Sequence, residues 1–313
     1  MEMSIHTKFD SPAIVMMMKF SININKSANF YFFIQNLSEW HFSNRKDYND
    51  LWRKELGKFS EEEATALKKF KEIRLQHKSA KTIFEQAFFV SQNPWEKLKI
   101  DLPPEDYAIT QKVFNNLEEK FNLLWEHDLP LLVKWQKELD DKINEESLLK
   151  SILDALIALF NSPSSEQEVK TYLLFSSPIH TGGGANIDKQ SISLEISRYP
   201  TQDVNHAIGI IWHETIHLCF QNQYFFPLLL KQFPNDPQKV NFINEIIIGS
   251  LFPKGILGIR LLKNKPANKL MANISPEQTV EIINLTKKYV NDKKPLDDKY
   301  INTIAEILKK QMR

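Results

Sequence analysis

Hydrophobic residues recur every three or four positions through most of the first half of the chain, as in Phe114, Leu117 and Phe121. This spacing gathers apolar side chains on one face of an α-helix. It predicts helices over 27–37, 47–57, 60–76, 79–91, 104–126, 128–143 and 145–161. A helix break is expected near Pro130, because proline lacks the N–H group that an α-helix uses.

Strand-like segments follow another pattern, in which apolar and polar residues alternate. This pattern predicts strands at 16–25, 169–176 and 191–197, with a loop of three glycines at 182–184 before the last strand. Helical spacing returns over 202–224, 236–252, 275–292 and 297–312. We therefore expect a predominantly helical α+β protein, in which a small mixed sheet packs on a buried helix.

A short polar stretch, Asn-Ser-Pro-Ser-Ser at 161–165, separates the two kinds of pattern. It divides the chain into a mainly helical N-terminal region, 1–163, and a second region, 164–313. The alternative is one continuous compact unit, because 313 residues suit either arrangement.

Charge and composition narrow the class of partner. Lys+Arg (40) nearly balances Asp+Glu (39), so there is no electrostatic reason to expect nucleic acid or an anionic membrane surface as a partner. No stretch approaches the roughly 20 apolar residues that cross a bilayer. Cys219 is the one cysteine, so no intramolecular disulfide can form. We expect a soluble, cytoplasmic protein without a membrane or nucleic-acid partner.

Candidate chemistry is concentrated in the motif His-Glu-Thr-Ile-His at 213–217. Residues four apart on a helix lie one above the other, so His213 and His217 can bind one metal ion. Glu214 then lies beside the metal, where it can act as a general base on metal-bound water. Zinc is the metal that this arrangement predicts.

The surroundings of this motif favour a bound metal over a chance match. Residues 207–220 are apolar nearly all round, so the helix should be buried. Two histidines and a glutamate are costly there unless they are paired or liganded. The alternative is a satisfied pair of core histidines beside a surface glutamate.

Catalytic zinc usually has three protein ligands. Phe220 and Gln223 occupy the positions of the metzincin glycine and third histidine, which excludes that class. Asp236 and Glu245 are the carboxylate candidates. Asp236 precedes Pro237 and suits a helix N-cap. Glu245 is isolated in an apolar helix and is the preferred third ligand, because such a carboxylate needs a cation.

These residues resemble the gluzincins, zinc peptidases with two HExxH histidines and a downstream glutamate. Asn244-Glu245 is similar to the third-ligand motif of their aminopeptidase branch, and Gly182 to Asn186 is similar to its substrate loop. The resemblance covers about residues 170–255 and implies a zincin-like catalytic domain within 164–313. Ala185 replaces the loop glutamate that grips a free amino terminus, so exopeptidase specificity is not carried over. Glu245 follows His217 by 28 positions, which is longer than usual for these enzymes and implies an insertion near 225–236.

Several other residues have a predicted role near the site. Gly183 and Gly184 are candidates for substrate approach, and strand 191–197 is expected at the sheet edge, where a peptide can add as a strand. His180 is a candidate to polarise a carbonyl or steady an oxyanion, with an ordinary surface histidine as the alternative. Further candidates of this kind are Tyr289, Tyr300, Arg260 and, as a supporting residue, His206.

The leading hypothesis is a zinc-dependent peptidase acting on a peptide or protein substrate. Glu214 takes a proton from metal-bound water and passes it to the leaving amine. Two alternatives stay open: a non-catalytic protein in which zinc braces a helical interaction module, and a zinc hydrolase of a non-peptide bond.

Overall fold

The computed structural model describes residues 18–40, 46–77, 83–162, 167–176, 182–186, 191–197, 203–222, 225–266 and 275–309. Helices account for 73% of these residues, and the strands form one small mixed sheet. The predicted class, a predominantly helical α+β fold, is confirmed.

The helices between the first and second strands are α1 (Lys26–Ser38), α2 (Lys46–Leu56), α3 (Glu61–Gln76), α4 (Ile83–Glu85), η1 (Gln86–Val90), α5 (Pro94–Asp101), α6 (Pro104–Ile143) and α7 (Glu146–Phe160). The strands are β1 (Met18–Ile24), β2 (Gln167–Ser176), β3 (Gly182–Asn186) and β4 (Ser191–Ser197). The later helices are α8 (Val204–Thr215), η3 (Ile216–Phe220), α9 (Phe225–Gln232), α10 (Pro237–Gly249), α11 (Ile256–Leu262), α12 (Pro276–Asp292) and α13 (Asp298–Lys309).

The sheet joins the two halves of the chain in the order β1-β2-β4-β3. β1 and β4 each pair with β2 in parallel, with Met18 opposite Gln167 and Lys170 opposite Ser191. β3 pairs with β4 in the antiparallel direction. The region before residue 163 therefore supplies one strand of the sheet, and the division into two domains stays a prediction.

Two expectations about the sheet were wrong. The triple glycine at 182–184 lies in strand β3 and not in a loop. Strand β4 was expected at the edge, yet it lies between β2 and β3. The cause is that alternation locates a half-buried strand but carries no information about its pairing partner, and a glycine run has no alternation at all.

The two edges of the sheet differ. α6 covers β1, where Gln136 Nε2 donates to the Ile22 carbonyl at 2.7 Å and Asn144 bonds to both the N–H and the carbonyl of Phe20 at 3.3 Å. These side chains supply the hydrogen bonds that a further strand would make. In the described part of the chain, β3 has no strand on its other side.

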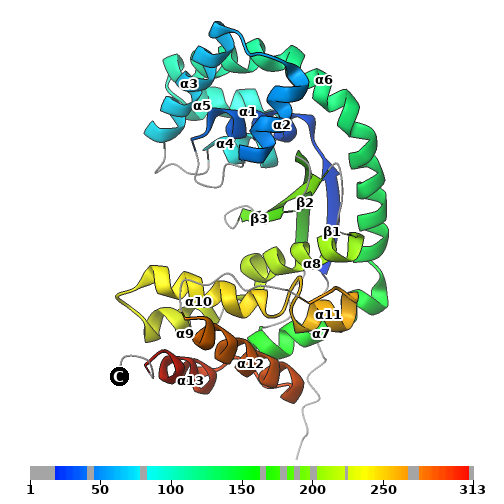
Figure 1. The fold of residues 1–313 in the computed structure, drawn as a ribbon, viewed down its shortest axis with the longest axis vertical. Helices are drawn as coiled ribbons and strands as arrows, with labels where there is room; N and C mark the ends of the chain where they lie inside the picture. Colours follow the sequence, from blue (N-terminus) through cyan, green and yellow to red (C-terminus); the bar gives the residue numbers. More distant parts are fainter. Residues whose placement is uncertain are drawn as a thin grey trace, which may run out of the picture.

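Helix α6 runs without a break through Pro130, contrary to the expected break. Pro130 is exposed, so the solvent can hydrate the carbonyl group that loses its partner, and a bend is the usual consequence. Figure 1 shows α6 as a long arc along one side of the molecule, from the layer of α1 to α5 down to α7.

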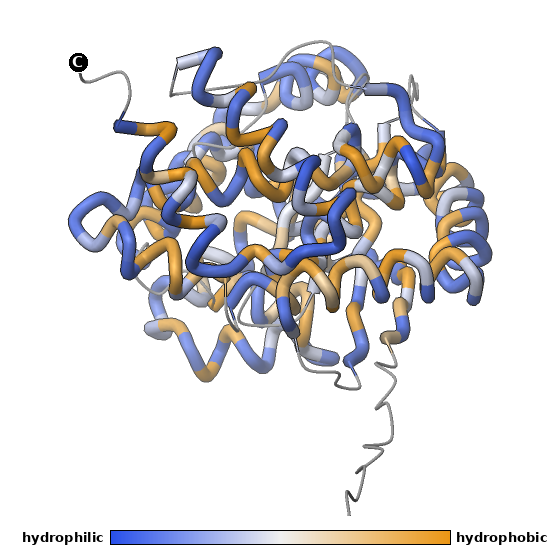
Figure 2. The backbone as a smooth tube through the Cα atoms, turned by 90° about the horizontal axis from the view of Figure 1, so that it is seen from below, coloured by the Kyte–Doolittle hydropathy of each residue, from blue (hydrophilic) through white to orange (hydrophobic). Residues whose placement is uncertain are grey.

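The sheet packs on α8, as predicted. Trp212 of α8 and Phe20 of β1 are both buried, and their rings meet edge to face with centroids 4.9 Å apart. On α1, the buried Asn29 donates to the Leu173 carbonyl and accepts from the Phe175 N–H, which extends the pairing of β2 beyond the end of β1. Along the helices the tube alternates between hydrophilic and hydrophobic stretches, as expected for elements that each bury one face (Figure 2).

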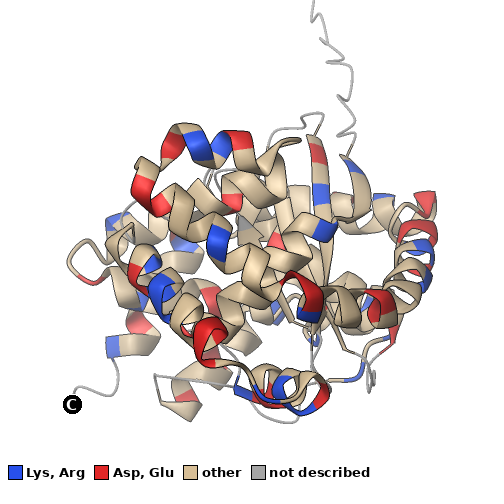
Figure 3. Cartoon of the chain, turned by 90° about the horizontal axis from the view of Figure 1, so that it is seen from above, with Lys and Arg blue, Asp and Glu red and all other residues tan. Residues whose placement is uncertain are grey.

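Short helices account for most of the remaining differences. α5, α9 and α11 were not predicted, because seven or eight residues carry too few turns for a clear period. α9 lies in the 225–236 stretch that was expected to be an insertion. No helix among the described residues is long and apolar enough to cross a membrane. Basic and acidic residues are interspersed on the helices seen from above (Figure 3).

Candidate metal centre

The HExxH motif lies on α8 and η3, a helix with a side-chain cap at its N-terminus and apolar residues that bury it. The Asp203 side chain accepts the His206 N–H at 3.0 Å and caps the N-terminus of α8. The apolar residues that follow pack under the sheet, and Ile208 and Ile211 are fully buried. The helix continues beyond Thr215 as the π-helical turn η3, so His213 lies in an α-helical turn and His217 in a π-helical one.

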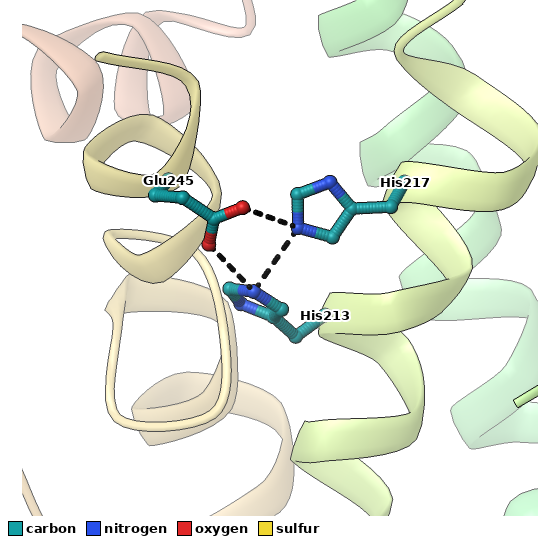
Figure 4. Close-up of side chains that lie close together, drawn as sticks. All are labelled: His213, His217 and Glu245. Carbon is teal, nitrogen blue, oxygen red and sulfur yellow. Dashed lines mark hydrogen bonds and ion pairs between the residues drawn. The ribbon is translucent and has the colours of Figure 1, made fainter. Parts of the chain in front are cut away.

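Helix α10 brings Glu245 to the two histidines (Figure 4). The Nε2 atoms of His213 and His217 are 3.2 Å apart. The Glu245 carboxylate lies 3.4 Å from the first and 3.3 Å from the second. A tetrahedral metal ion with bonds of about 2.0–2.1 Å holds its ligand atoms about 3.3 Å apart, so the three groups are spaced to be able to hold such an ion.

The hydrogen-bond partner at Nδ1 decides which nitrogen of each imidazole carries a proton. His213 Nδ1 lies 3.2 Å from the Phe252 carbonyl oxygen, and His217 Nδ1 lies 2.9 Å from Gln221 Oε1. Both partners are acceptors, so each Nδ1 carries a proton and each Nε2 atom is the one that faces Glu245. Only a cation between these three acceptors, a proton or a metal ion, makes their contact attractive. Imidazole nitrogen and carboxylate oxygen are ligands that zinc prefers.

Electrostatics at the site favour a charged carboxylate. Burial acts to raise the pKa of Glu245, but hydrogen bonds and charges from His213 and His217 outweigh it and hold the pKa well below its usual range. Burial acts to lower the pKa of His213, but Glu245 and Glu214 outweigh it and raise that pKa. The Glu245 side chain is 56% exposed, whereas the His213 side chain is 16% exposed, so the open side of the site is the Glu245 side.

Glu214 lies against the edge strand. A Cβ atom built on Gly183 would be 3.5 Å from Glu214 Oε1, and the Ala185 backbone N–H donates a hydrogen bond to the Glu214 carboxylate. Burial raises the pKa of Glu214, although both histidines and the Ala185 bond oppose this effect. A carboxylate with a raised pKa is a better proton acceptor near neutral pH.

The remaining predicted site residues have varied positions. Gly184 lies on β3 with open space at its Cβ position. Asp236 caps α10 by accepting the Lys239 N–H at 3.0 Å, which confirms its predicted role as an N-cap. His180 lies outside the described residues.

None of the three oxyanion candidates reaches the candidate metal ligands through a described contact. Tyr300 is fully buried and its hydroxyl pairs with Thr286 at 2.6 Å. The Tyr289 ring packs on that of Tyr300, with centroids 4.8 Å apart. Arg260 donates to Asn291 on α12 at 2.7 Å. These contacts place all three in the packing of α11, α12 and α13.

His206 is half-buried on α8, and Cys219 is buried on η3. Burial lowers the pKa of His206 to about 4, and Lys254 adds to the effect, so this imidazole is neutral at pH 7. Burial raises the pKa of Cys219 to about 12, which keeps the thiol protonated.

Sequence reasoning missed the groups that orient the ligands. Gln221 was detectable, because it lies four positions after His217 on the same helix. The Phe252 carbonyl and the Ala185 N–H are backbone groups, and no residue type marks them. Comparisons with models of known protein families, with curated proteins and with solved structures found no match.

Proposed function

We propose that this protein is a zinc-dependent peptidase. The observation that carries the proposal is the group of three acceptor side chains, His213, His217 and Glu245, whose facing atoms are 3.2–3.4 Å apart next to the half-buried Glu214. Two imidazoles and a carboxylate with a neighbouring general base are the side chains that zinc hydrolases use.

Each residue has a separate role in the proposal. His213, His217 and Glu245 would hold the metal. Zinc, when bound, supplies Lewis-acid chemistry that polarises a carbonyl group and lowers the pKa of water. Glu214 accepts the proton of the attacking water and delivers it to the leaving amine, a task for which its raised pKa is suited.

The sheet edge supports an extended peptide as the substrate. β3 is the outer strand of the described sheet and lies directly against Glu214 at Gly183. A peptide that adds to this edge as a strand would pass the general base. Gly184, with nothing within 4 Å of its Cβ position, leaves room beside that path.

Glu214→Gln tests the proposal. The variant should bind zinc like the wild type, because Glu214 is not among the three ligands, and should lose about 10²–10⁴-fold in the rate of peptide cleavage. Cleavage of a peptide library is followed by mass spectrometry, together with bound metal per chain. Glu306→Gln makes the same charge change at an exposed position and is the control. Full activity of Glu214→Gln would sink the mechanism.

The contact between Glu214 and β3 favours one other function. Because the Ala185 N–H donates to this carboxylate, Glu214 also serves to join the helix to the sheet. A non-catalytic protein in which zinc braces the helices would use the same contact. Its distinguishing property is that the fold depends on the metal, whereas a catalytic site tolerates metal removal.

A further inference from the structure

The turn that carries His217 is π-helical, and it brings the Gln221 side chain within hydrogen-bond distance of the imidazole. The Gln221 N–H bonds to the Ile216 carbonyl at 3.0 Å, five positions earlier, which widens the helix by one residue. Such turns occur mostly as single bulges inside α-helices, and they are frequent at functional sites. Gln221 follows directly, and only 4% of it is exposed.

One oxygen atom of Gln221 serves two helices. Gln221 Oε1 accepts from His217 Nδ1 at 2.9 Å and from Asn244 Nδ2 at 2.7 Å. Asn244 is itself 3% exposed and precedes Glu245 on α10. This oxygen thus connects one candidate ligand to the neighbour of another, at the point where the two helices must keep their spacing.

The two histidines are oriented in different ways. His213 is held by a backbone carbonyl, that of Phe252, which no side-chain substitution removes. Among the described contacts, the Gln221 side chain is the one hydrogen-bond partner of His217 Nδ1. The orientation of His217 is therefore the part of the site that depends on a single replaceable group.

We propose that Gln221 is a positioning residue of the metal centre. It fixes the His217 tautomer with the Nε2 lone pair toward Glu245, and through Asn244 it sets the distance between η3 and α10. The inference rests on the proposed function only in that His213, His217 and Glu245 bind a metal. Partners of this kind typically contribute 10–100-fold in metal affinity.

Two substitutions at this position separate positioning from packing. Gln221→Leu keeps the approximate volume and removes the acceptor, so zinc affinity should fall about 10–100-fold. Gln221→Glu keeps an acceptor for both His217 and Asn244, so its affinity should stay within a few-fold of the wild type. Asn222→Leu, which replaces an amide by the same apolar side chain at the exposed neighbouring position, is the control and should leave the affinity unchanged.

Zinc affinity is measured by competition with a chromophoric chelator, and the absorption bands of bound Co²⁺ report the ligand geometry. Thermal unfolding of each metal-free variant identifies any that fails to fold. Equal loss of affinity in Gln221→Leu and Gln221→Glu, or none in Gln221→Leu, would overturn the inference. Absence of zinc binding by the wild type would instead overturn the proposed function.

Discussion

Gly183 on β3 lies against the HExxH helix, and it has no side chain to hold the strand away from that helix. A Cβ atom at this position would lie 2.5 Å from Cγ2 of Ile210 and 3.4 Å from Cγ of Glu214. Ile210 is β-branched, helical and 7% exposed, so its methyl group has little freedom to move aside. The missing side chain at 183 thus allows β3 to lie against Glu214, the proposed general base.

Gly183→Ala is expected to lower the free energy of unfolding by about 1–3 kcal/mol, as overpacking does, and to reduce peptide cleavage because β3 must move away from Glu214. Gly184→Ala is the matched control on the next residue, since nothing lies within 4 Å of its added Cβ. Urea unfolding compares the two variants. If both were as stable as the wild type, the close approach would have no energetic weight.

At the scale of elements, α6 takes the place of a neighbouring strand along the free edge of β1. Its Gln136 and Asn144 side chains satisfy backbone groups of Ile22 and Phe20 along one edge of the sheet. An unpaired strand edge is a site of unwanted pairing with other chains, and a covering helix prevents it. The opposite edge, β3, is the one beside the proposed catalytic residues.

Gln136→Ala should cost about 1 kcal/mol of stability, because the Ile22 carbonyl loses a 2.7 Å hydrogen bond. Lys134→Ala on the same helix removes only an exposed ion pair with Glu138 at 3.9 Å and should cost close to nothing. Chemical denaturation measures both. An equal effect of the two substitutions would mean that the edge contact adds nothing to stability.

Elements with a regular pattern were predictable from the sequence, and their contacts were not. The ends of β4 and the four-residue spacing of His213 and His217 follow directly from periodicity. The isolation of Glu245 among apolar residues identified the third member of the group. The edge position of β3 depends on pairing over long sequence distances, and the orientation of His213 depends on a carbonyl group of Phe252, so neither leaves a signature in residue types.

At the scale of the whole molecule, the helices that carry the candidate ligands are held by apolar contacts of their own. Ile208 and Ile211 of α8 and Ile243 and Ile247 of α10 are fully buried. We therefore expect this scaffold to fold without the metal. This property is the point on which the catalytic and bracing functions differ.

Removal of zinc by a chelator should therefore abolish cleavage while far-UV circular dichroism stays unchanged. The free energy of unfolding should fall by the amount that mass action gives, about 4 kcal/mol at a metal concentration 1,000 times Kd, and the melting temperature falls with it. His217→Ala, which lacks one ligand, should be insensitive to the chelator. Unfolding of the wild type on chelation at room temperature would favour the bracing function.

The parallel pairing of β1 with β2 has a consequence for how the chain is made. Asn29 and Phe175, which bond to each other next to this pairing, are 146 residues apart. At about 5–20 residues per second, a ribosome needs on the order of ten seconds to supply β2 after β1 has emerged. During that interval the helices from α1 to α7 can form, but the apolar face of β1 has no sheet to join. The platform under which the HExxH helix packs is thus assembled late, and the early strand is where a nascent chain is most exposed to misassociation.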